Sequence, residues 1–327
     1  MDRFALKKGW LPIVRGVMVA GLALGVVFAV ACGNDDDGED VANPPSLPAA
    51  TAPGGNAVST STAAGGGAGT ATSGSTAPTV QLTARDFAYD INDSIVGGLV
   101  RLEMRNTGQE PHHAQFARLN DGVTQQQFTA ALMNPDPTAA LGMISLAGGP
   151  GVILPGQTQV VYDTLAAGKY TLLCFVESAD GLPHAAKGMV DFIDVTAPTG
   201  TAPTPPTAQS QMTIADFSFT GGDTVPASRT TVEVTNNGPQ PHEVALIKLD
   251  AGVTAEQVRA MFASTTPPAG PPPFKEAGGL QAIMPGTKGF MELNLAAGNY
   301  AYICFVPDPA SGAPHFALGM FKGFTVR

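Results

Sequence analysis

The chain has 327 residues, of which 44% are hydrophobic and 7% aromatic, and it contains 39 glycines and 28 prolines. This length allows two ordinary domains, each with its own core, and the glycine and proline content favours turn-rich β structure over helical bundles. The formal net charge of -10 argues against nucleic acid as a partner.

The N-terminal residues have the pattern of a targeting segment. Four basic residues between positions 3 and 15 precede an uncharged run, residues 16–31, that ends at Cys32. The arrangement resembles a bacterial lipoprotein signal over residues 1–32, with Cys32 as the lipidated N-terminus of the mature chain. An uncleaved anchor helix starting near Leu11 and simple secretion are the alternatives. Each predicts that the rest lies outside the cytoplasm, in the periplasm or at the cell surface. In the lipoprotein and anchor alternatives, the lipid or the anchor tethers it to the membrane.

Two segments are too poor in large apolar residues to fold. Residues 33–78 begin with an acidic stretch and continue almost entirely in Ala, Thr, Ser, Gly and Pro, and residues 197–210 are rich in Pro and Thr. Such segments cannot bury enough apolar surface to offset the entropy of ordering. We expect a disordered tether over 33–78 and a semi-extended linker over 197–210. This linker separates two domains, 79–196 and 211–327, which are expected to move independently.

The two domains are copies of one another. A shift of 130 residues aligns them without gaps through the segment that contains the cysteine, after which one residue is inserted. The matched segments are Asp86-Phe87 with Asp216-Phe217, Pro111-His112 with Pro241-His242, Cys174-Phe175-Val176 with Cys304-Phe305-Val306 and, beyond the insertion, His184 and Met189 with His315 and Met320. A duplication of this kind predicts the same fold and the same kind of site twice.

Alternating apolar and polar residues predict β strands. Val100, Leu102 and Met104 alternate with charged residues, and the pattern recurs in the second copy. Such alternation predicts a sheet with one buried face and one face exposed to solvent. Residues 159–163 and 170–175 are joined by an Ala-Ala-Gly turn. They predict a hairpin whose second strand ends near Cys174.

Each copy also predicts one short helix. Thr124 is followed three residues later by Gln127, and Thr254 by Gln257, which is the spacing of a capping box. The apolar positions of these helices suit packing on a sandwich; they are Phe128, Leu132, Val258 and Phe262.

The cysteines are few and regularly placed. If Cys32 is lipidated, Cys174 and Cys304 remain as one thiol per domain, so a disulfide within either domain is impossible. An unpaired thiol is a liability in an oxidising compartment, and ligation of a soft metal would explain why it is retained twice. The alternative is a small buried hydrophobic residue with no chemistry.

The histidines favour the metal hypothesis. The chain has five histidines, and four of them fall in matched pairs. The predicted ligand sets are His112, Cys174, His184 and Met189 in the first domain and His242, Cys304, His315 and Met320 in the second. Two imidazoles and a thiolate form a trigonal plane around copper, and a weak axial thioether tunes its reduction potential. Taken singly, each of these residues has an ordinary explanation as a surface or core side chain.

The motifs around these residues resemble those of cupredoxins, the blue copper family that includes plastocyanin and the type 1 domains of copper nitrite reductases. The resemblance covers 79–196 and 211–327. It rests on three segments and their counterparts in the second copy: Asn106-Thr107-Gly108 leading to Pro111-His112, the strand Tyr170-Thr171-Leu172-Leu173-Cys174, and Pro183-His184 to Met189. It implies an all-β fold of two tandem Greek-key sandwiches, each with one short helix, and up to one copper per domain. The second histidine is implied to be exposed and to serve as the electron exit.

Two features depart from the family pattern. The loop between cysteine and second histidine is longer than in most small blue proteins and nearer to that of the nitrite-reductase type 1 site. His113 and Glu243 stand where cupredoxins usually carry an Asn that ties the two ligand loops together. His113 is also a competing candidate for the ligand role of His112, although the repeat alignment favours His112. That leaves His113 as a supporting or exposed residue.

The resemblance implies an extracytoplasmic electron carrier whose partner is a cytochrome or a membrane oxidoreductase. The alternatives are copper delivery or sequestration with the same ligands, and a metal-free interaction module. We expect no catalysis, because multicopper oxidases and nitrite reductases need further histidines and only His113 is left over.

Overall fold

The computed structural model describes residues 75–134, 138–264 and 270–327, and all of them belong to one compact unit. The predicted signal peptide with Cys32 and residues 33–74 of the tether lie outside the described residues. No helix within the described ranges is long and apolar enough to span a membrane.

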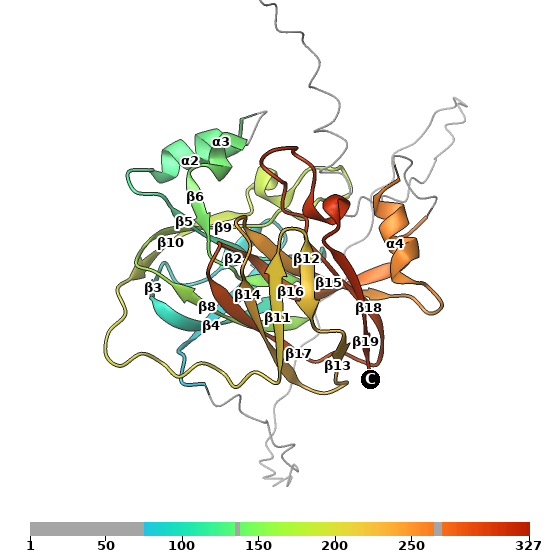
Figure 1. The fold of residues 1–327 in the computed structure, drawn as a ribbon. Helices are drawn as coiled ribbons and strands as arrows, with labels where there is room; N and C mark the ends of the chain where they lie inside the picture. Colours follow the sequence, from blue (N-terminus) through green and yellow to red (C-terminus); the bar gives the residue numbers. More distant parts are fainter. Residues whose placement is uncertain (1–74, 135–137, 265–269) are drawn as a thin grey trace, which may run out of the picture. The chain divides into compact units, whose positions relative to one another are not determined.

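The first repeat runs from β1 to β10 (Figure 1). Its strands are β1 (Thr79–Arg85), β2 (Ala88–Asp90), β3 (Ser94–Val96), β4 (Gly98–Asn106), β5 (Gln115–Leu119), β6 (Ile144–Leu146), β7 (Pro150–Val152), β8 (Thr158–Leu165), β9 (Gly168–Leu173) and β10 (Val190–Thr196). Its helices are α2 (Gln125–Leu132), α3 (Thr138–Leu141) and the 3-10 turn η2 (His184–Lys187).

The second repeat has the corresponding elements. Its strands are β11 (Ser210–Ala215), β12 (Ser218–Gly221), β13 (Thr224–Val225), β14 (Thr230–Asn236), β15 (His242–Leu249), β16 (Phe274–Ile283), β17 (Lys288–Leu293), β18 (Gly298–Ile303) and β19 (Phe321–Val326). Its helices are α4 (Ala255–Phe262) and the 3-10 turn η3 (His315–Leu318).

Each repeat is a sandwich of two sheets, as expected. In the first repeat the strand orders are β2-β1-β4-β8 and β3-β10-β9-β5-β6, and in the second they are β12-β11-β14-β17 and β13-β19-β18-β15-β16. The two orders are the same when the repeats are aligned, including the parallel pairs β1 with β4 and β11 with β14. The duplication seen in the sequence is therefore a duplication of the whole sandwich.

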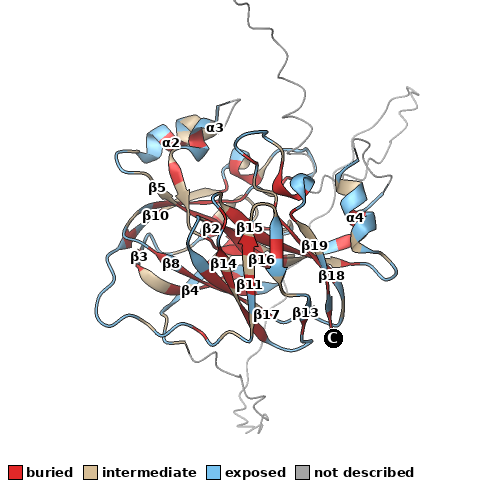
Figure 2. Cartoon of the chain, viewed as in Figure 1, coloured by how far each residue is buried: buried red, intermediate tan, exposed pale blue. Residues whose placement is uncertain are grey.

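The predicted alternation places the core. Val100, Leu102 and Met104 of β4 are fully buried, whereas the charged residues between them lie on the more exposed face. They pack with residues of the opposite sheet, such as Leu172 and Ile193, in one hydrophobic cluster. Buried residues follow the strands in both repeats, whereas α2 and α4 keep an exposed face (Figure 2).

The predicted hairpin is wrong in its pairing. The two strands exist as β8 and β9, and β9 ends at Leu173, directly before Cys174. However, β8 belongs to the sheet of β4 and β9 to the opposite sheet, so the chain crosses between layers at Ala166-Ala167-Gly168. The hydroxyl of Tyr170 donates to the carbonyl of Ala166 at 3.0 Å and holds this corner. Local alternation gives the strands but not the partner with which each one pairs.

The predicted helices form with their predicted caps. Thr124 and Thr254 each accept from the backbone N–H of the glutamine three residues later, and that glutamine side chain accepts from the backbone N–H of the cap residue. Phe128 of α2 and Val258 of α4 are the fully buried residues of these helices. The first repeat has one further short helix, α3, which the sequence did not predict.

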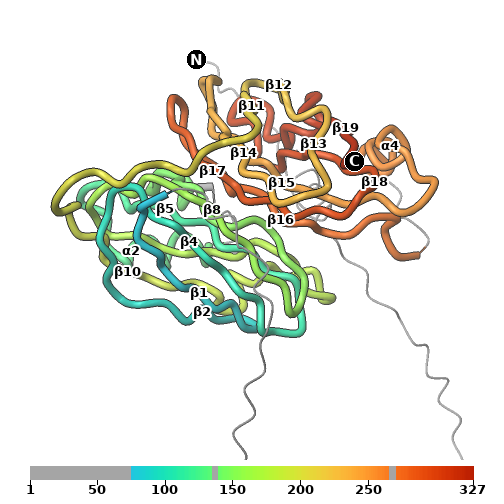
Figure 3. Tube along the Cα trace, turned by 90° about the horizontal axis from the view of Figure 1, so that it is seen from below, coloured from blue at the N-terminus to red at the C-terminus, as the bar shows by residue number. Residues whose placement is uncertain are grey.

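The two repeats are joined through their sheets, contrary to the expectation of independent motion. Strand β8 pairs with β17 through Val160–Tyr162 and Phe290–Glu292 (Figure 3). Strand β7 pairs with β16, and the Gln115 amide both donates to the carbonyl of Ala282 and accepts from its N–H. A sandwich leaves edge strands with unpaired backbone groups, and here each repeat satisfies the edge of the other.

Candidate metal centres

The loop before the first histidine is fixed by the last residue of β4. The Asn106 amide donates to the carbonyls of Glu110 and Ile153 at 2.8 and 3.0 Å, and its oxygen accepts from the N–H of Gly108. A side chain at Gly108 would place its first carbon 2.8 Å from Nε2 of His112, so only glycine permits this close approach. Asn236 makes the same three bonds in the second repeat.

The cysteine and the second histidine are placed by backbone hydrogen bonds within one loop. Cys174 follows β9, its N–H donates to the carbonyl of Met189, and its own carbonyl accepts from Ala185 at 2.8 Å. The N–H of His184 donates to the carbonyl of Val176. The second repeat makes the matching bonds around Cys304 in spite of its inserted residue. The longer loop is thus folded into a defined turn that ends in η2 or η3.

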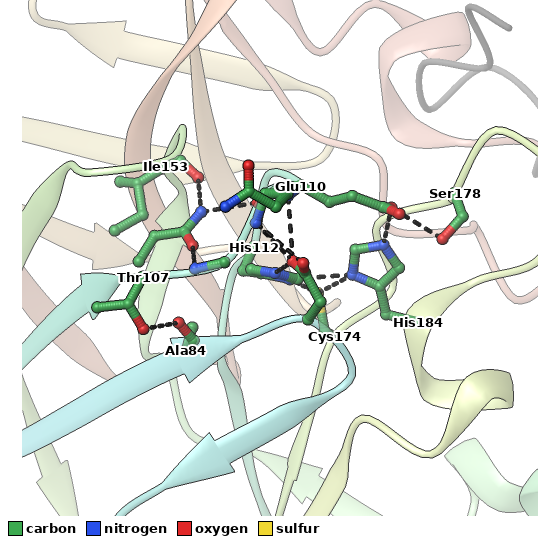
Figure 4. Close-up of polar contacts among 12 residues, drawn as sticks. Ala84, Thr107, Glu110, His112, Ile153, Cys174, Ser178 and His184 are labelled. Carbon is green, nitrogen blue, oxygen red and sulfur yellow. Dashed lines mark hydrogen bonds and ion pairs between the residues drawn. The ribbon is translucent and has the colours of Figure 1, made fainter. Parts of the chain in front are cut away.

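These two loops bring three donor atoms together in each repeat. In the first site Nδ1 of His112 lies 3.0 Å from Nδ1 of His184, and Sγ of Cys174 lies 4.0 and 3.5 Å from these two atoms (Figure 4). In the second site the corresponding distances among His242, His315 and Cys304 are 2.9, 4.0 and 3.4 Å. All six side chains are buried.

The spacing of the donor atoms fits a trigonal metal site. Metal bonds of about 2.0 to 2.3 Å in a trigonal plane place imidazole nitrogens and thiolate sulfur about 3.5 to 3.8 Å apart. The observed distances of 2.9 to 4.0 Å bracket that range. Soft thiolate with two imidazoles is a donor set that copper accepts.

The opposite side of each imidazole determines where its proton lies. Nε2 of His112 is 3.0 Å from a carboxylate oxygen of Asp86, and Nε2 of His184 is 2.8 Å from one of Glu110. A carboxylate oxygen only accepts, so each Nε2 carries the proton and each Nδ1 presents a lone pair to the site. Asp216 serves His242 in the same way at 2.6 Å.

The fourth imidazole has a neutral partner. The Gln240 amide nitrogen donates to Asp308, so its oxygen faces Nε2 of His315 at 3.0 Å. Two Nδ1 lone pairs that converge on one sulfur repel each other unless a cation lies between them. Burial raises the pKa of the Cys174 thiol to about 12, and a bound metal would be needed to hold it as a thiolate. The His-Cys-His group of each repeat therefore fits a copper ion, up to one per domain.

Comparison with known proteins gives matches among solved structures alone. No protein-family model and no curated protein matches the chain. The auracyanin of Roseiflexus castenholzii is 19% identical over 37% of this chain and 98% of its own, with a TM-score of 0.26. A copper nitrite reductase from Nitrosomonas europaea is 14% identical over 76% of this chain and 93% of its own, with a TM-score of 0.21. A multicopper oxidase is 17% identical over 76% and 88%, with a TM-score of 0.20.

The chain is a two-domain cupredoxin-like protein. Its two sandwiches share one strand order, and each places a His-Cys-His group at the same point of that order.

The expectation that the protein is not a catalyst is corrected by these matches. It rested on the number of histidines left over after both sites are filled. Structures similar to this cupredoxin-like chain include a multicopper oxidase and copper nitrite reductases, which are enzymes. A count of histidines in one chain therefore does not exclude catalysis.

The predicted axial residues lie in the same cores. Met189 and Met320 are fully buried and belong to the hydrophobic cluster that contains Cys174 and Cys304. Their N–H groups donate to the carbonyls of His184 and His315 at 2.9 Å. The ligand role of their sulfur atoms stays a prediction.

His113 and Glu243 tie the two ligand loops together. Nε2 of His113 accepts from the N–H of Phe175 at 2.8 Å, and a carboxylate oxygen of Glu243 accepts from the N–H of Phe305 at 2.7 Å. His113 is buried, so the alternative of an exposed residue is wrong. Burial lowers the pKa of His113 to about 3, which keeps the ring neutral and able to accept. Different residues thus replace the family asparagine in its bridging position.

The second histidine is not exposed as the resemblance implied. His184 and His315 are both 0% exposed. Phe87 and Phe217 pack edge-on against them, with ring centroids 5.2 and 5.0 Å away. In the first repeat Glu110 covers Nε2 as well and is itself partly exposed. Any route from the site to solvent on this side passes through these covering residues.

The partners of the imidazoles were not predicted from the sequence. Asp86 and Asp216 stand in a dipeptide that is identical in both repeats, and that match was the signal for them. Burial alone would raise the pKa of Asp86, but hydrogen bonds from Gln109 and His112 lower it overall. Glu110 and Gln240 differ between the repeats and gave no such signal.

Proposed function

We propose that this cupredoxin-like protein carries single electrons through one copper ion in each repeat, outside the cytoplasm. The observation that carries the proposal is the convergence of two Nδ1 lone pairs and one buried thiol in each sandwich. Copper bound there supplies one-electron chemistry. The chain supplies a buried site whose ligand loops are held by backbone and side-chain hydrogen bonds, so the ligands need move little when the charge changes.

The alternative of copper delivery or sequestration has less support. A delivery site must exchange its ion with a partner, which requires accessible ligands. The histidines and cysteines of both sites are buried, and their loops are closed by hydrogen bonds. A redox partner such as a cytochrome or a membrane oxidoreductase is proposed instead, and the acidic net charge favours a basic docking face.

Visible absorption of the copper-loaded chain tests this function. We expect an intense thiolate-to-copper band that falls by half in Cys174→Ser and in Cys304→Ser and disappears in the double variant. Cys32→Ser is the matched control, because it makes the same substitution at a cysteine that belongs to neither predicted ligand set, and it should leave the band unchanged. A copper-loaded protein without this band would refute the electron-transfer proposal and favour copper handling.

The location is tested separately with the same control variant. The sequence of residues 1–32 supports export and lipidation at Cys32. We expect the protein in the membrane fraction on the outer side of the cytoplasmic membrane, and Cys32→Ser in the soluble extracytoplasmic fraction. Recovery of the unaltered chain from the cytoplasm would contradict the proposed location.

A further inference from the structure

The two sites differ at one contact to a ligand imidazole. Nε2 of His184 faces the Glu110 carboxylate at 2.8 Å, whereas Nε2 of His315 faces the Gln240 amide oxygen at 3.0 Å. The first histidines do not differ in this way, because Asp86 and Asp216 contact them in both sites. The duplication thus provides an internal comparison in which a charged partner is replaced by a neutral one.

Both partners are held in place by further hydrogen bonds. The hydroxyl of Ser178 donates to the same Glu110 oxygen that faces His184, at 2.8 Å. The Gln240 amide nitrogen donates to Asp308 at 3.0 Å. In the second site the nearest charge on this side is therefore that of Asp308, which contacts Gln240 and not the imidazole. In the first site the charge of Glu110 contacts the imidazole directly.

A carboxylate that accepts the Nε2 proton increases the electron donation of Nδ1 to a metal. It also brings a full negative charge to a buried imidazole, and because the Glu110 side chain is itself 35% exposed, water screens this interaction in part. Both effects stabilise Cu(II) relative to Cu(I). A neutral amide oxygen has the same geometry without the full charge.

We propose that Glu110 sets the reduction potential of the first-repeat site below that of the second-repeat site, where Gln240 stands in its place. The inference rests on the proposed electron-transfer function. With copper bound in both repeats, one electron from the proposed redox partner, which is itself oxidised by one electron, would reduce Cu(II) to Cu(I) at the second-repeat site and leave the first-repeat site oxidised.

The sites also differ at a second position, where the second repeat has Glu243 and the first has His113. A charge on Glu243 would lower the potential of the second site and so oppose the effect of Glu110. The Glu243 carboxylate accepts from the N–H of Phe305, and no hydrogen bond joins it to a ligand imidazole among the described residues. Substitutions made within one site leave the residue at this position unchanged. The effect of Glu110 and Gln240 can thus be measured without it.

Redox titration of the thiolate-to-copper band in single-site proteins tests the proposal. Cys304→Ser leaves the first site and Cys174→Ser leaves the second. We expect a lower potential for the first site. Adding Glu110→Gln should raise the potential of the first site. The expected rise is at least a tenfold change in the one-electron equilibrium constant, which is about 59 mV. Adding Gln240→Glu to the other protein should lower its potential, and Glu110→Asp should retain most of the original value.

Asp194→Asn is the matched control, because it removes one negative charge from the first repeat at a residue that pairs with Lys169 and touches no ligand. A first-site potential above that of the second site overturns the proposal. So does a Glu110→Gln shift no larger than that of the control. If neither single-site protein has the band, the electron-transfer function itself fails. A band with unchanged potentials refutes the role of Glu110 alone.

Discussion

The buried acceptor between the two ligand loops is a different residue in each repeat. His113 and Glu243 both accept the N–H of the phenylalanine that follows the cysteine. A buried N–H without a partner is costly, so this position selects for an acceptor of the right reach and not for one residue type. The predicted ligands themselves are identical in the two repeats, as a shared metal would require.

His113→Ala is expected to destabilise the first repeat. It removes a buried ring that accepts from the N–H of Phe175, a residue that is itself partly exposed, and the lost hydrogen bond is worth about 0.5 to 1.5 kcal/mol. Thermal unfolding of the copper-loaded chain measures the effect. His113→Gln is the matched variant, since its side-chain oxygen has a similar reach and should recover most of the loss. Equal melting temperatures for the alanine variant and the unaltered chain would contradict the bridging role.

Asn106→Asp is expected to weaken the first site while nearly conserving size. The amide nitrogen of Asn106 donates to the carbonyls of Glu110 and Ile153, and a carboxylate has no proton to donate to either. The loop that carries His112 then loses one buried and one partly buried hydrogen bond, and the buried one is worth about 1 to 3 kcal/mol. Copper titration should show weaker binding at the first site and unchanged binding at the second, which serves as the internal control.

At the scale of elements, short-range sequence signals were sufficient for the helices and the ligand loops. The capping boxes at Thr124 and Thr254 form as predicted because the bonds join residues three apart. The His-Cys-His groups also come together as the two matched copies predicted. In both cases the information lies within one segment or is repeated in the second copy.

Pairings between distant segments could not be predicted in the same way. Strand β8 has the alternation of a hairpin strand, yet it pairs with β4 and, on its other edge, with β17 of the second repeat. Glu110 reaches His184 across 74 residues, and nothing local distinguishes it from any surface carboxylate. Register and side-chain contact over such separations are determined by the packed fold.

The caps give a prediction at this scale. Thr124→Ala removes the acceptor for the N–H of Gln127 at the start of α2, at a cost of about 1 kcal/mol. Hydrogen exchange of the α2 amides should become faster, with little change in α4. Thr124→Ser keeps the hydroxyl and should behave like the unaltered chain. Thr254→Ala should have the reciprocal effect on α4, and an equal response of both helices to either variant would contradict independent caps.

At the scale of the whole molecule, the described repeats share sheets and not only a linker. Asp163 of β8 lies where they meet, because a side-chain carbon added at Gly289 of the second repeat would be 2.6 Å from its Oδ1. Its other oxygen accepts from the N–H of Gly149 at 2.9 Å, and Oδ1 has no hydrogen-bond partner. A carboxyl group in such surroundings is far more stable when protonated.

Asp163 is therefore expected to make stability fall as pH rises. Burial raises the pKa of Asp163 to about 8 from an ordinary value of 3.8, so the folded protein keeps this proton in a range where the unfolded chain has lost it. The contribution is fully present below pH 3.8 and is lost progressively up to about pH 8. Asp163→Asn cannot ionise. The difference between the free energies of unfolding at pH 5 and pH 8 should then shrink by at least about 1.4 kcal/mol, which corresponds to one pKa unit. Denaturant unfolding of both proteins at the two pH values measures this, and groups such as Glu177 cancel because they are present in both. An unchanged pH difference in Asp163→Asn would show that the carboxyl group is not held protonated at the junction of the repeats.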